Sequence, residues 1–278
     1  MSRLIAQHKS KTMLATIQTQ QIQTIRTGQL EVRPATTMAE LDAAMRLRFE
    51  VFNLELQEGL RSSYERGYDK DAYDAYCDHL IVKDLELDEV VGTYRLLRQG
   101  VADKQIGFYS ENEFDLSRLK SAVGFQGGEL LELGRSCIAQ THRSFATINL
   151  LWGAIARYAA ERGITHLFGC GSLHIADLTE VQRVYSFLRS RHFASEAYRV
   201  YPLDHCRMAV GGESEQPIDS RAAMKKLSPI LKGYLRTGAV ICGEPAYDEE
   251  FGTADVLVLV EMARLAGRYR QHYIAETA

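Results

Sequence analysis

The sequence predicts an α/β fold in which helices flank a mixed, twisted β-sheet with a bulged central strand. Residues 80–82 and 90–97 are typical of two strands joined by an Asp-Glu turn. Residues 132–170 carry the pattern of strand, helix and strand that connects parallel strands. The first strand of that unit contains Glu-Leu-Gly-Arg-Ser at residues 132–136, where the glycine predicts an interruption.

The interruption decides which side chains share a face. Side chains alternate along a strand, so Glu132 and Arg135 should face opposite sides. A bulge at Gly134 would place both on one face, because glycine accepts the backbone angles of a bulged residue and one extra residue shifts the alternation. The sheet would then have a gap that admits a substrate. The alternative is a regular strand with Glu132 in solvent and Arg135 paired elsewhere.

The composition, with 278 residues and a formal net charge of −3, is that of a soluble globular protein. This charge argues against wholesale nucleic-acid binding, so an acidic partner has to meet a local basic patch. No apolar run approaches the roughly 20 residues that a membrane-spanning helix needs, and no secretory signal is recognisable. We therefore expect a cytoplasmic protein that does not bind nucleic acid.

The cysteine and histidine patterns predict no metal site. The five cysteines are widely spaced without a CxxC pair, and the eight histidines form no H-x-H or HExxH pattern. Reduced thiols fit this spacing better than a disulfide framework. Cys137 and Cys170 lie in apolar, strand-like runs, where a buried thiol that fills space is commoner than a nucleophile.

The chain is expected to begin with a flexible extension over residues 1–27, which is rich in Gln, Thr and Lys. One domain is expected over residues 28–278, because no repeat or linker divides it. Its first helix should start at a capping box formed by Thr37 and Glu40.

That helix contains the first candidate binding residues. Leu41, Met45, Arg48 and Phe52 fall on one helical stripe. Burying Arg48 without a partner would be costly, so it should pair with a buried carboxylate or point at a ligand. The alternative is an arginine that reaches solvent from the helix edge.

An acidic loop and a second arginine follow. The polar segment 59–76 is too long for a simple connection and carries Asp69, Asp71 and Asp74, which suggests a substrate-covering loop. On the second of the two strands that come next, Arg95 shares a face with apolar residues.

The later part of the chain predicts further regular elements. They are helices at Ile148–Ala160, Leu178–Leu188 and Met224–Leu235, and strands at Thr165–Cys170, Ala239–Cys242 and Val256–Val260.

Two motifs are set aside. His79 and Asp84 match the H-x4-D spacing of glycerolipid acyltransferases, but a strand between them would send their side chains to opposite faces. The second box of that family is matched at residues 58–62, before the first instead of after it. Gly-Cys-Gly-Ser at residues 169–172 fits neither a nucleophile elbow nor a dinucleotide loop, so its glycines are expected to allow close approach of a strand or a ligand.

Eight stretches carry a resemblance to a known family. They are Leu-Arg-Phe-Glu-Val-Phe at residues 47–52, the loop at 71–74, Cys-Asp-His-Leu at 77–80, Gly-Thr-Tyr-Arg-Leu-Leu at 92–97, Gly-Phe-Tyr-Ser at 107–110, Glu-Leu-Gly-Arg at 132–135, Leu-Phe-Gly-Cys at 167–170 and Lys-Gly-Tyr-Leu-Arg at 232–236. The chain resembles the N-acyl amino acid synthases of the GNAT fold, and more distantly the acyl-homoserine-lactone synthases. It is most similar to the bacterial ornithine-lipid synthases, sometimes labelled hemolysins, over residues 30–273.

The resemblance implies transfer of a long-chain acyl group, often 3-hydroxylated, from acyl carrier protein to the α-amine of an amino acid. Ornithine is the leading acceptor, and the reaction would begin ornithine-lipid synthesis. The acyl thioester is the donor, with no bound cofactor. Because the product partitions into membrane, peripheral membrane contact is also expected. The alternatives are a signal synthase like the acyl-homoserine-lactone synthases and a non-catalytic module that binds acyl carriers.

Within this resemblance, Glu132 is the expected base, and the backbone amide of Ser136 the donor to the oxyanion. Arg135 completes the catalytic set. The expected substrate-binding residues are Arg48, Phe52, Asp71, Asp74 and Arg95. The arginines would hold the acceptor carboxylate and order the acidic loop. The aspartates would receive either the arginines or the side-chain amine of ornithine, and the sequence leaves both roles open.

The turn before the helix at 148–160 is the expected phosphate site. Arg143, Ala146 and Thr147 would bind the phosphopantetheine of the carrier, because free amides at a helix start attract anions. Ile148 would crowd a coenzyme A pyrophosphate, which favours the carrier protein. Basic residues within 183–191 or 225–236 are candidate docking sites for that acidic protein.

Overall fold

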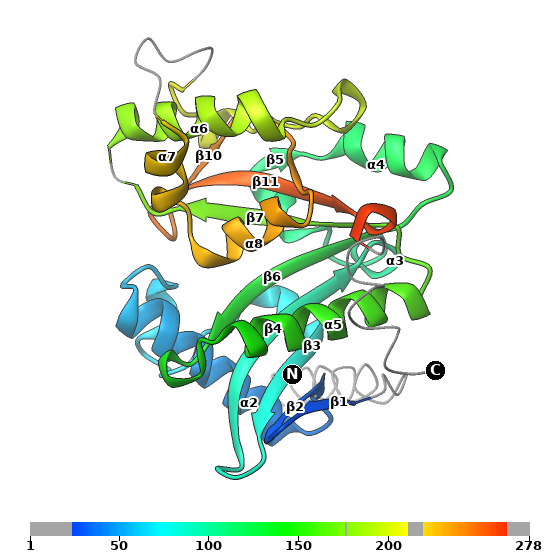
Figure 1. The fold of residues 1–278 in the computed structure, drawn as a ribbon, viewed down its shortest axis with the longest axis vertical. Coiled ribbons are helices and arrows are strands. Elements are labelled where there is room, and N and C mark those ends of the chain that lie inside the picture. Colours follow the sequence, from blue (N-terminus) through cyan, green and yellow to red (C-terminus); the bar gives the residue numbers. More distant parts are fainter. Residues whose placement is uncertain (1–23, 176, 211–218, 266–278) are drawn as a thin grey trace, which may run out of the picture. The chain divides into compact units, whose positions relative to one another are not determined.

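The computed structural model describes residues 24–175, 177–210 and 219–265 (Figure 1). They form two compact units. The first contains the described residues up to Gly107 and returns for Leu133–Arg162, whereas the second contains Phe108–Glu132 and the described residues from Gly163 on. The unit boundary falls inside strand β6 (Leu130–Ile138), so Glu132 ends one segment of the second unit and Leu133 continues the first.

The first unit is built on a sheet with the strand order β1-β2-β3-β4-β6. Its strands are β1 (Ile25–Thr27), β2 (Leu30–Pro34), β3 (Asp78–Asp84), β4 (Glu89–Arg98) and the part of β6 from Leu133 on. Strands β1 to β4 pair antiparallel in succession, and β3 and β4 confirm the two strands expected around the Asp-Glu turn. Strand β1 lies within the range expected for the N-terminal extension, and residues 1–23 lie outside the described residues.

Helices of the first unit cover this sheet. They are α2 (Met38–Arg48), a π-helical turn (Phe49–Glu55), α3 (Gln99–Ala102), α5 (Phe145–Glu161) and short 3-10 turns at Arg61–Ser63, Ala72–Ala75 and Gln140–His142. Helix α2 packs on β3 and β4, and α5, the green helix of Figure 1, packs on β1, β2 and β3. At the end of α5, Tyr158 Oη donates a 2.5 Å hydrogen bond to Asp78 Oδ2 on β3.

Helix α2 begins as the sequence predicts, with one difference. The Thr37 hydroxyl accepts from the backbone amide of Glu40. The Glu40 carboxylate accepts from the amide of Thr36 instead of Thr37, and it also pairs with Arg33 on β2. The cap therefore also ties the helix start to the neighbouring strand.

Within the second unit the strand order is β6-β7-β11-β10, with β9 paired to β11. Its strands are the first residues of β6, β7 (His166–Leu173), β9 (Val240–Ile241), β10 (Ala246–Asp248) and β11 (Thr253–Glu261), with β5 (Phe114–Asp115) and β8 (Tyr201–Pro202) in a separate pair. Strand β7 runs parallel to β6 and antiparallel to β11, which confirms the mixed sheet. The β6–β7 ladder stops at Glu132 and Phe168, although β7 continues to Leu173.

Helices of the second unit lie around these strands. They are α4 (Ser117–Phe125), α6 (Leu178–His192), α7 (Ser220–Lys226), α8 (Pro229–Arg236) and 3-10 turns at Tyr109–Asn112, Glu196–Tyr198 and Asp204–Cys206. Helix α6 packs on α7 and β9. Gly171 on β7 is approached closely, since a Cβ there would lie 3.0 Å from Val258 on β11 and 3.2 Å from Leu231 on α8. This close packing is what the glycines of residues 169–172 predict.

The single helix expected over 224–235 is wrong, because α7 ends at Lys226 and α8 begins at Pro229. Proline has no amide hydrogen to donate within a helix, so it fits the first turn and interrupts the interior. The Ser228 hydroxyl caps the new helix by accepting from the amide of Leu231. Among the described residues, no helix is long and apolar enough to cross a membrane.

Candidate active site

Strand β6 is irregular where the sequence predicts it, but at a different residue. Arg135 has a positive φ of 50°, whereas Gly134 is absent from the residues with positive φ. The expectation that glycine supplies the bulged conformation is therefore wrong in detail. A Cβ at Gly134 would lie 3.8 Å from Arg95 Nε, so the missing side chain leaves room for a guanidinium. The strained arginine is held by tertiary contacts, which is typical of functional sites.

Three arginines and three aspartates of the first unit form what we call the ion-pair cluster. Its members are Arg48, Arg95, Arg135, Asp69, Asp71 and Asp74. Arg48 is fully buried, donates to Asp69, and places Nη1 2.7 Å from Asp74 Oδ1. Arg95 Nη1 lies 2.7 Å from both Asp71 oxygens, and Arg135 Nη2 lies 3.1 Å from Asp71 Oδ2. The prediction that Arg48 pairs with a buried carboxylate is confirmed.

The ion-pair cluster holds the acidic loop against the sheet. Burial raises the pKa of Asp74, but the positive charges of Arg48 and Arg95 outweigh it and keep that pKa well below the usual range. The pKa of Asp71 is also lowered, since Arg95 and Arg135 outweigh its burial. Both aspartates are thus ionised partners of arginines. Of the two roles that the sequence leaves open for them, the structure shows this one.

The residues expected to bind phosphate lie at the start of α5. Ser144 caps the helix by accepting from the amide of Thr147 at 3.1 Å, and the Thr147 hydroxyl donates to the carbonyl of His142. Arg143 pairs with Glu55 and donates to the carbonyl of Ile138 at 2.9 Å.

Two further expected residues have simple surroundings. Phe52 is half-buried against Leu47, Val51 and Cys137, within the π-helical turn. Ser136 directly follows the residue with positive φ and is half-buried.

Glu132, in the second unit, is buried, and its carboxylate is surrounded by hydrogen-bond donors. Its carboxylate accepts from the amides of Tyr109 and Ser110 at 2.8 and 2.7 Å, and from the Ser110 hydroxyl at 2.6 Å. These donors belong to the 3-10 turn at Tyr109–Asn112. The turn therefore orients both carboxylate oxygens, as a positioned proton acceptor requires.

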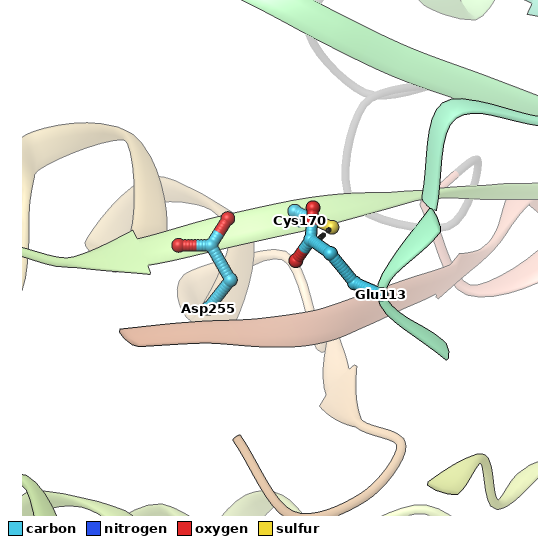
Figure 2. A group of neighbouring side chains, drawn as sticks. All are labelled: Glu113, Cys170 and Asp255. Atoms are coloured by element: carbon cyan, nitrogen blue, oxygen red, sulfur yellow. Dashed lines mark hydrogen bonds between the residues drawn. The ribbon is translucent and has the colours of Figure 1, made fainter. Parts of the chain in front are cut away.

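A second group of polar side chains lies next to this turn. We call this group the carboxylate cluster; its members are Glu113, Cys170 and Asp255 (Figure 2). One carboxylate oxygen of each acidic residue and the Sγ atom of Cys170 all lie within 4.8 Å of one another. Cys170 donates weak hydrogen bonds to Glu113 Oε2 at 3.6 Å and to the Ser110 hydroxyl at 3.4 Å. Cys170 is therefore half-buried beside polar groups instead of filling space in the core, and burial keeps its pKa well above the usual range, so it remains a thiol.

The protonation of the carboxylate cluster is unusual. Burial, together with the charges of Asp255 and Asp248, raises the pKa of Glu113 to about 9. Burial raises the pKa of Asp255 to about 6, against hydrogen bonds from Thr253 and Ser172 that lower it. Two carboxylates so close in a buried place cannot both ionise cheaply without a cation.

This arrangement predicts a pH-dependent effect of Glu113→Gln on stability. An unfolded Glu titrates near pH 4.3, so between about pH 4.3 and 9 unfolding of the wild type releases a proton and becomes easier as pH rises. Glutamine has no such proton. The variant should therefore melt above the wild type at pH 8, by at least about 2 °C, and the difference should shrink towards pH 5.

Melting curves of both proteins from pH 5 to pH 9 measure this difference. Glu196→Gln, at a side chain that is 75% exposed in the same unit, serves as the control and should show no pH-dependent change. A Glu113→Gln effect that is constant across this pH range would contradict the assignment of a neutral Glu113.

The carboxylate cluster is the part of the site that the sequence analysis missed. Glu113 and Asp255 belong to no recognised spacing, and Cys170 was assigned to the core. The one usable signal is the stretch Gly-Phe-Tyr-Ser at residues 107–110, which belongs to the family resemblance and ends three residues before Glu113. In contrast, His79 and Asp84 do not pair with each other. His79 contacts the carbonyl of Asp74, and Asp84 contacts His142.

Comparisons with known proteins agree with this architecture. Residues 47–153 match the family model described as Acetyltransferase (GNAT) domain. The L-ornithine N(alpha)-acyltransferase of Brucella abortus (strain 2308) is 39% identical over 259 residues, which is 90% of this chain and 91% of that protein. The protein of the same name from Rhizobium meliloti (strain 1021) is 35% identical, over 90% and 86% of the two chains.

A solved structure shares the fold. FeeM, an N-acyl amino acid synthase from uncultured soil microbes, superimposes with a TM-score of 0.51 at 11% identity, over 87% of this chain and 96% of that one. The fold and these relatives define an N-acyltransferase of the GNAT fold. The chain belongs to the L-ornithine N(alpha)-acyltransferase family, since relatives at 35–39% identity match about nine-tenths of its length. The resemblance predicted from the sequence is thereby confirmed.

Proposed function

We propose that this protein transfers a long-chain, 3-hydroxylated acyl group from acyl carrier protein to the α-amine of ornithine, as the first step of ornithine-lipid synthesis. The observation that carries the proposal is the sequence identity of 35–39%, over 90% of this chain, to relatives named for ornithine Nα-acylation. The three hydrogen bonds that hold the Glu132 carboxylate support it, because a general base has to be fixed within reach of the proton that it takes.

In the proposed reaction, the α-ammonium group of the acceptor first gives a proton to Glu132, directly or through a water molecule. The reference pKa of an α-amine, about 8, makes this a modest demand at neutral pH. The free amine then forms the new C–N bond at the thioester carbon. The C–S bond breaks, and the carrier thiol leaves with a proton. The amide of Ser136 is the proposed donor to the oxyanion.

The arginines of the ion-pair cluster are proposed to act in two ways. Arg48 orders the acidic loop, because it is fully buried between Asp69 and Asp74. Arg95 and Arg135 share Asp71, and we propose that they also bind the acceptor carboxylate, for which a guanidinium offers paired donors. Phe52 is the proposed apolar wall of the substrate site.

The proposed acyl donor is a carrier-bound phosphopantetheine. The start of α5, a 17-residue helix, supports this. Ser144 accepts a hydrogen bond from the amide of Thr147, whereas the amides of Phe145 and Ala146 lie in the first turn, where a helix supplies no acceptor for them and a phosphate could. Arg143 precedes them in the same turn, and a phosphate would compete with Glu55 for its guanidinium. No resident cofactor is needed in this scheme. The protein would work in the cytoplasm, with peripheral contact to the membrane that receives the lipid.

Docking of the carrier protein should use basic residues of α6 and α7. The two patches expected from the sequence meet here, because Arg183 and Lys226 both pair with Glu180. The double change Arg189→Glu and Arg191→Glu should raise KM for the acyl carrier protein at least about fivefold. This effect on KM should become smaller at high salt, because exposed charges act mainly on the rate at which the two proteins associate and salt screens them.

KM for a short acyl-pantetheine thioester, which lacks the carrier protein, should stay unchanged in the same variant. Arg118→Glu on α4, another exposed arginine of the second unit, is the matched control. Equal KM values of wild type and double variant for the acyl carrier protein would remove this helix as the docking surface.

The direct test incubates the purified protein with a 3-hydroxyacyl carrier protein, a mixture of amino acids and S-adenosylmethionine, with products identified by mass spectrometry. N-acyl-ornithine as the main product is expected. A different N-acyl amino acid would change the acceptor, and methylthioadenosine would indicate a lactone-type synthase instead. An intact thioester throughout, from a folded sample, would contradict the proposal.

A further inference from the structure

The ion-pair cluster and the carboxylate cluster differ in one respect. In the ion-pair cluster of the first unit each aspartate has an arginine partner. In the second unit, neither Glu113 nor Asp255 has an arginine or lysine partner within the described part of the chain, although each residue is only 4% exposed. The charge of His174 acts on Asp255 and lowers its pKa, but less than burial raises it. Oε1 of Glu113 is buried and has no hydrogen-bond partner there. A buried acceptor without a donor is costly, which indicates that a ligand supplies the donor.

We propose that Glu113 and Asp255 bind the side-chain ammonium group of the acceptor, and so make the enzyme selective for a diamino acid over a neutral one. This inference rests on the proposed function and identifies the residues that set its acceptor specificity. It also replaces the earlier hypothesis that Asp71 or Asp74 receives this amine.

The strands bring the right chemistry to one face. Asp255 on β11 pairs in register with Ser172 on β7, and Cys170 lies two residues before Ser172, on the same face of the sheet. Glu113 reaches that face from the segment between the 3-10 turn and β5, as Figure 2 shows. An ammonium group has three donors and needs acceptors for all of them. Glu113 and Asp255 each offer a carboxylate oxygen, and these two oxygens lie within 4.8 Å of each other.

The cluster also lies next to the proposed base. The Ser110 hydroxyl donates to Glu132 at 2.6 Å and accepts from Cys170 at 3.4 Å, while Cys170 also donates to Glu113. The charge of Glu132 contributes to the raised pKa of Glu113. An acceptor with an amine at each end could thus present one to Glu132 and the other to Glu113 and Asp255.

The charge balance agrees with an organic cation. Without a ligand, the raised pKa of Glu113 leaves it protonated at neutral pH. On binding, the ammonium charge would lower that pKa, and Glu113 would release its proton to solvent. Hard divalent metal ions fit less well than an ammonium group, because they need more oxygen ligands than this cluster offers. Mg²⁺ and Ca²⁺ prefer about six oxygen ligands or more, and the cluster has two carboxylates.

The test compares ornithine with norvaline, which has the same carbon chain without the terminal amine. For each variant the measured quantity is the ratio of kcat/KM for ornithine to kcat/KM for norvaline. The wild type should favour ornithine by at least about 100-fold, because norvaline leaves buried polar groups unpaired. Glu113→Gln and Asp255→Asn should each lower the ratio at least tenfold. Asp204→Asn, at a side chain that is 96% exposed in the same unit, is the control and should keep it.

Calorimetric binding of ornithine and norvaline to wild type and variants gives a second readout that does not need turnover. A wild type that acylates no amino acid would contradict the proposed function, whereas ornithine binding weakened by Glu113→Gln would still support the site. If one variant does not fold, the other gives the same comparison.

The proposal is overturned by any of three results. The first is a wild type that does not distinguish ornithine from norvaline in either assay. The second is an unchanged ratio in the folded variants. The third is a metal effect on stability. If Zn²⁺, Mn²⁺ or Mg²⁺ alone raises the melting temperature of the wild type but not that of Glu113→Gln, the cluster holds a metal.

Discussion

Replacing Glu132 with Gln is expected to lower kcat at pH 7 by at least about 100-fold, the usual effect of removing a general base. Glutamine keeps the size of the side chain but cannot take up a proton. The loss should shrink as pH rises above about 8, because the α-amine of the acceptor then loses its proton to solvent without help. Steady-state rates from pH 6.5 to 9.5 with ornithine and a fixed acyl donor measure this profile.

The hydrogen bonds of Glu132 make a structural control necessary. Glutamine can accept from the amide and hydroxyl of Ser110, but its NH2 group would then face the amide of Tyr109. Two donors that face each other cost roughly 1–3 kcal/mol of stability. Circular dichroism and melting curves should therefore show a folded but less stable variant.

A purely structural role of Glu132 predicts a different result. In that case the rate would fall by the same factor at every pH, in proportion to the folded fraction. Glu196→Gln, an exposed change in the same unit, should keep both rate and melting temperature. Full activity of a folded Glu132→Gln protein at neutral pH would exclude Glu132 as the base.

Arg48→Met is expected to cause the largest loss of stability, about 3–5 kcal/mol in the free energy of unfolding. Arg48 is fully buried and contacts both Asp69 and Asp74. Methionine fills much of the volume but leaves two buried carboxylates without that partner. The pKa of Asp74 should rise as a result, because the charge of Arg48 is the leading cause that lowers it.

Urea unfolding of the variant, compared with Arg46→Met, measures this effect. Arg46 is exposed on the same helix, so its replacement should change stability by no more than about 0.5 kcal/mol. Adding Asp69→Asn to Arg48→Met should recover part of the loss, since it removes one of the stranded charges. Equal stabilities of the two arginine variants would show that the ion-pair cluster does not support the fold.

Several features could be predicted from the sequence because short-range chemistry decides them. The capping role of Thr37, the strand pair around the turn at 85–88 and the burial of Arg48 with carboxylates all follow from local pattern and from the cost of burying a charge. The family resemblance was also correct, because its motifs are contiguous stretches of the chain.

The errors have local explanations as well. The helix expected over 224–235 divides at Pro229, a breaker that outweighs the apolar periodicity around it. The irregular residue of β6 is Arg135 and not Gly134, because contacts of the guanidinium with Asp69 and Asp71 hold an unfavourable backbone angle. Gly134, the neighbouring residue, has no side chain and so leaves room for the guanidinium of Arg95.

The sequence by itself determined the fold class, the family and most of the strands and helices that frame the site. Only the tertiary structure decided which of these carboxylates pair with arginines and which do not. Asp71 pairs with arginines of β4 and β6, and Asp74 with Arg48 of α2. Glu113 and Asp255, in contrast, meet through the register of β7 on β11 and the position of one 3-10 turn. The spacing of these residues in the sequence does not predict that they are neighbours. They come from three separate segments, and their side chains lie within 4.8 Å of one another only when the sheet has formed.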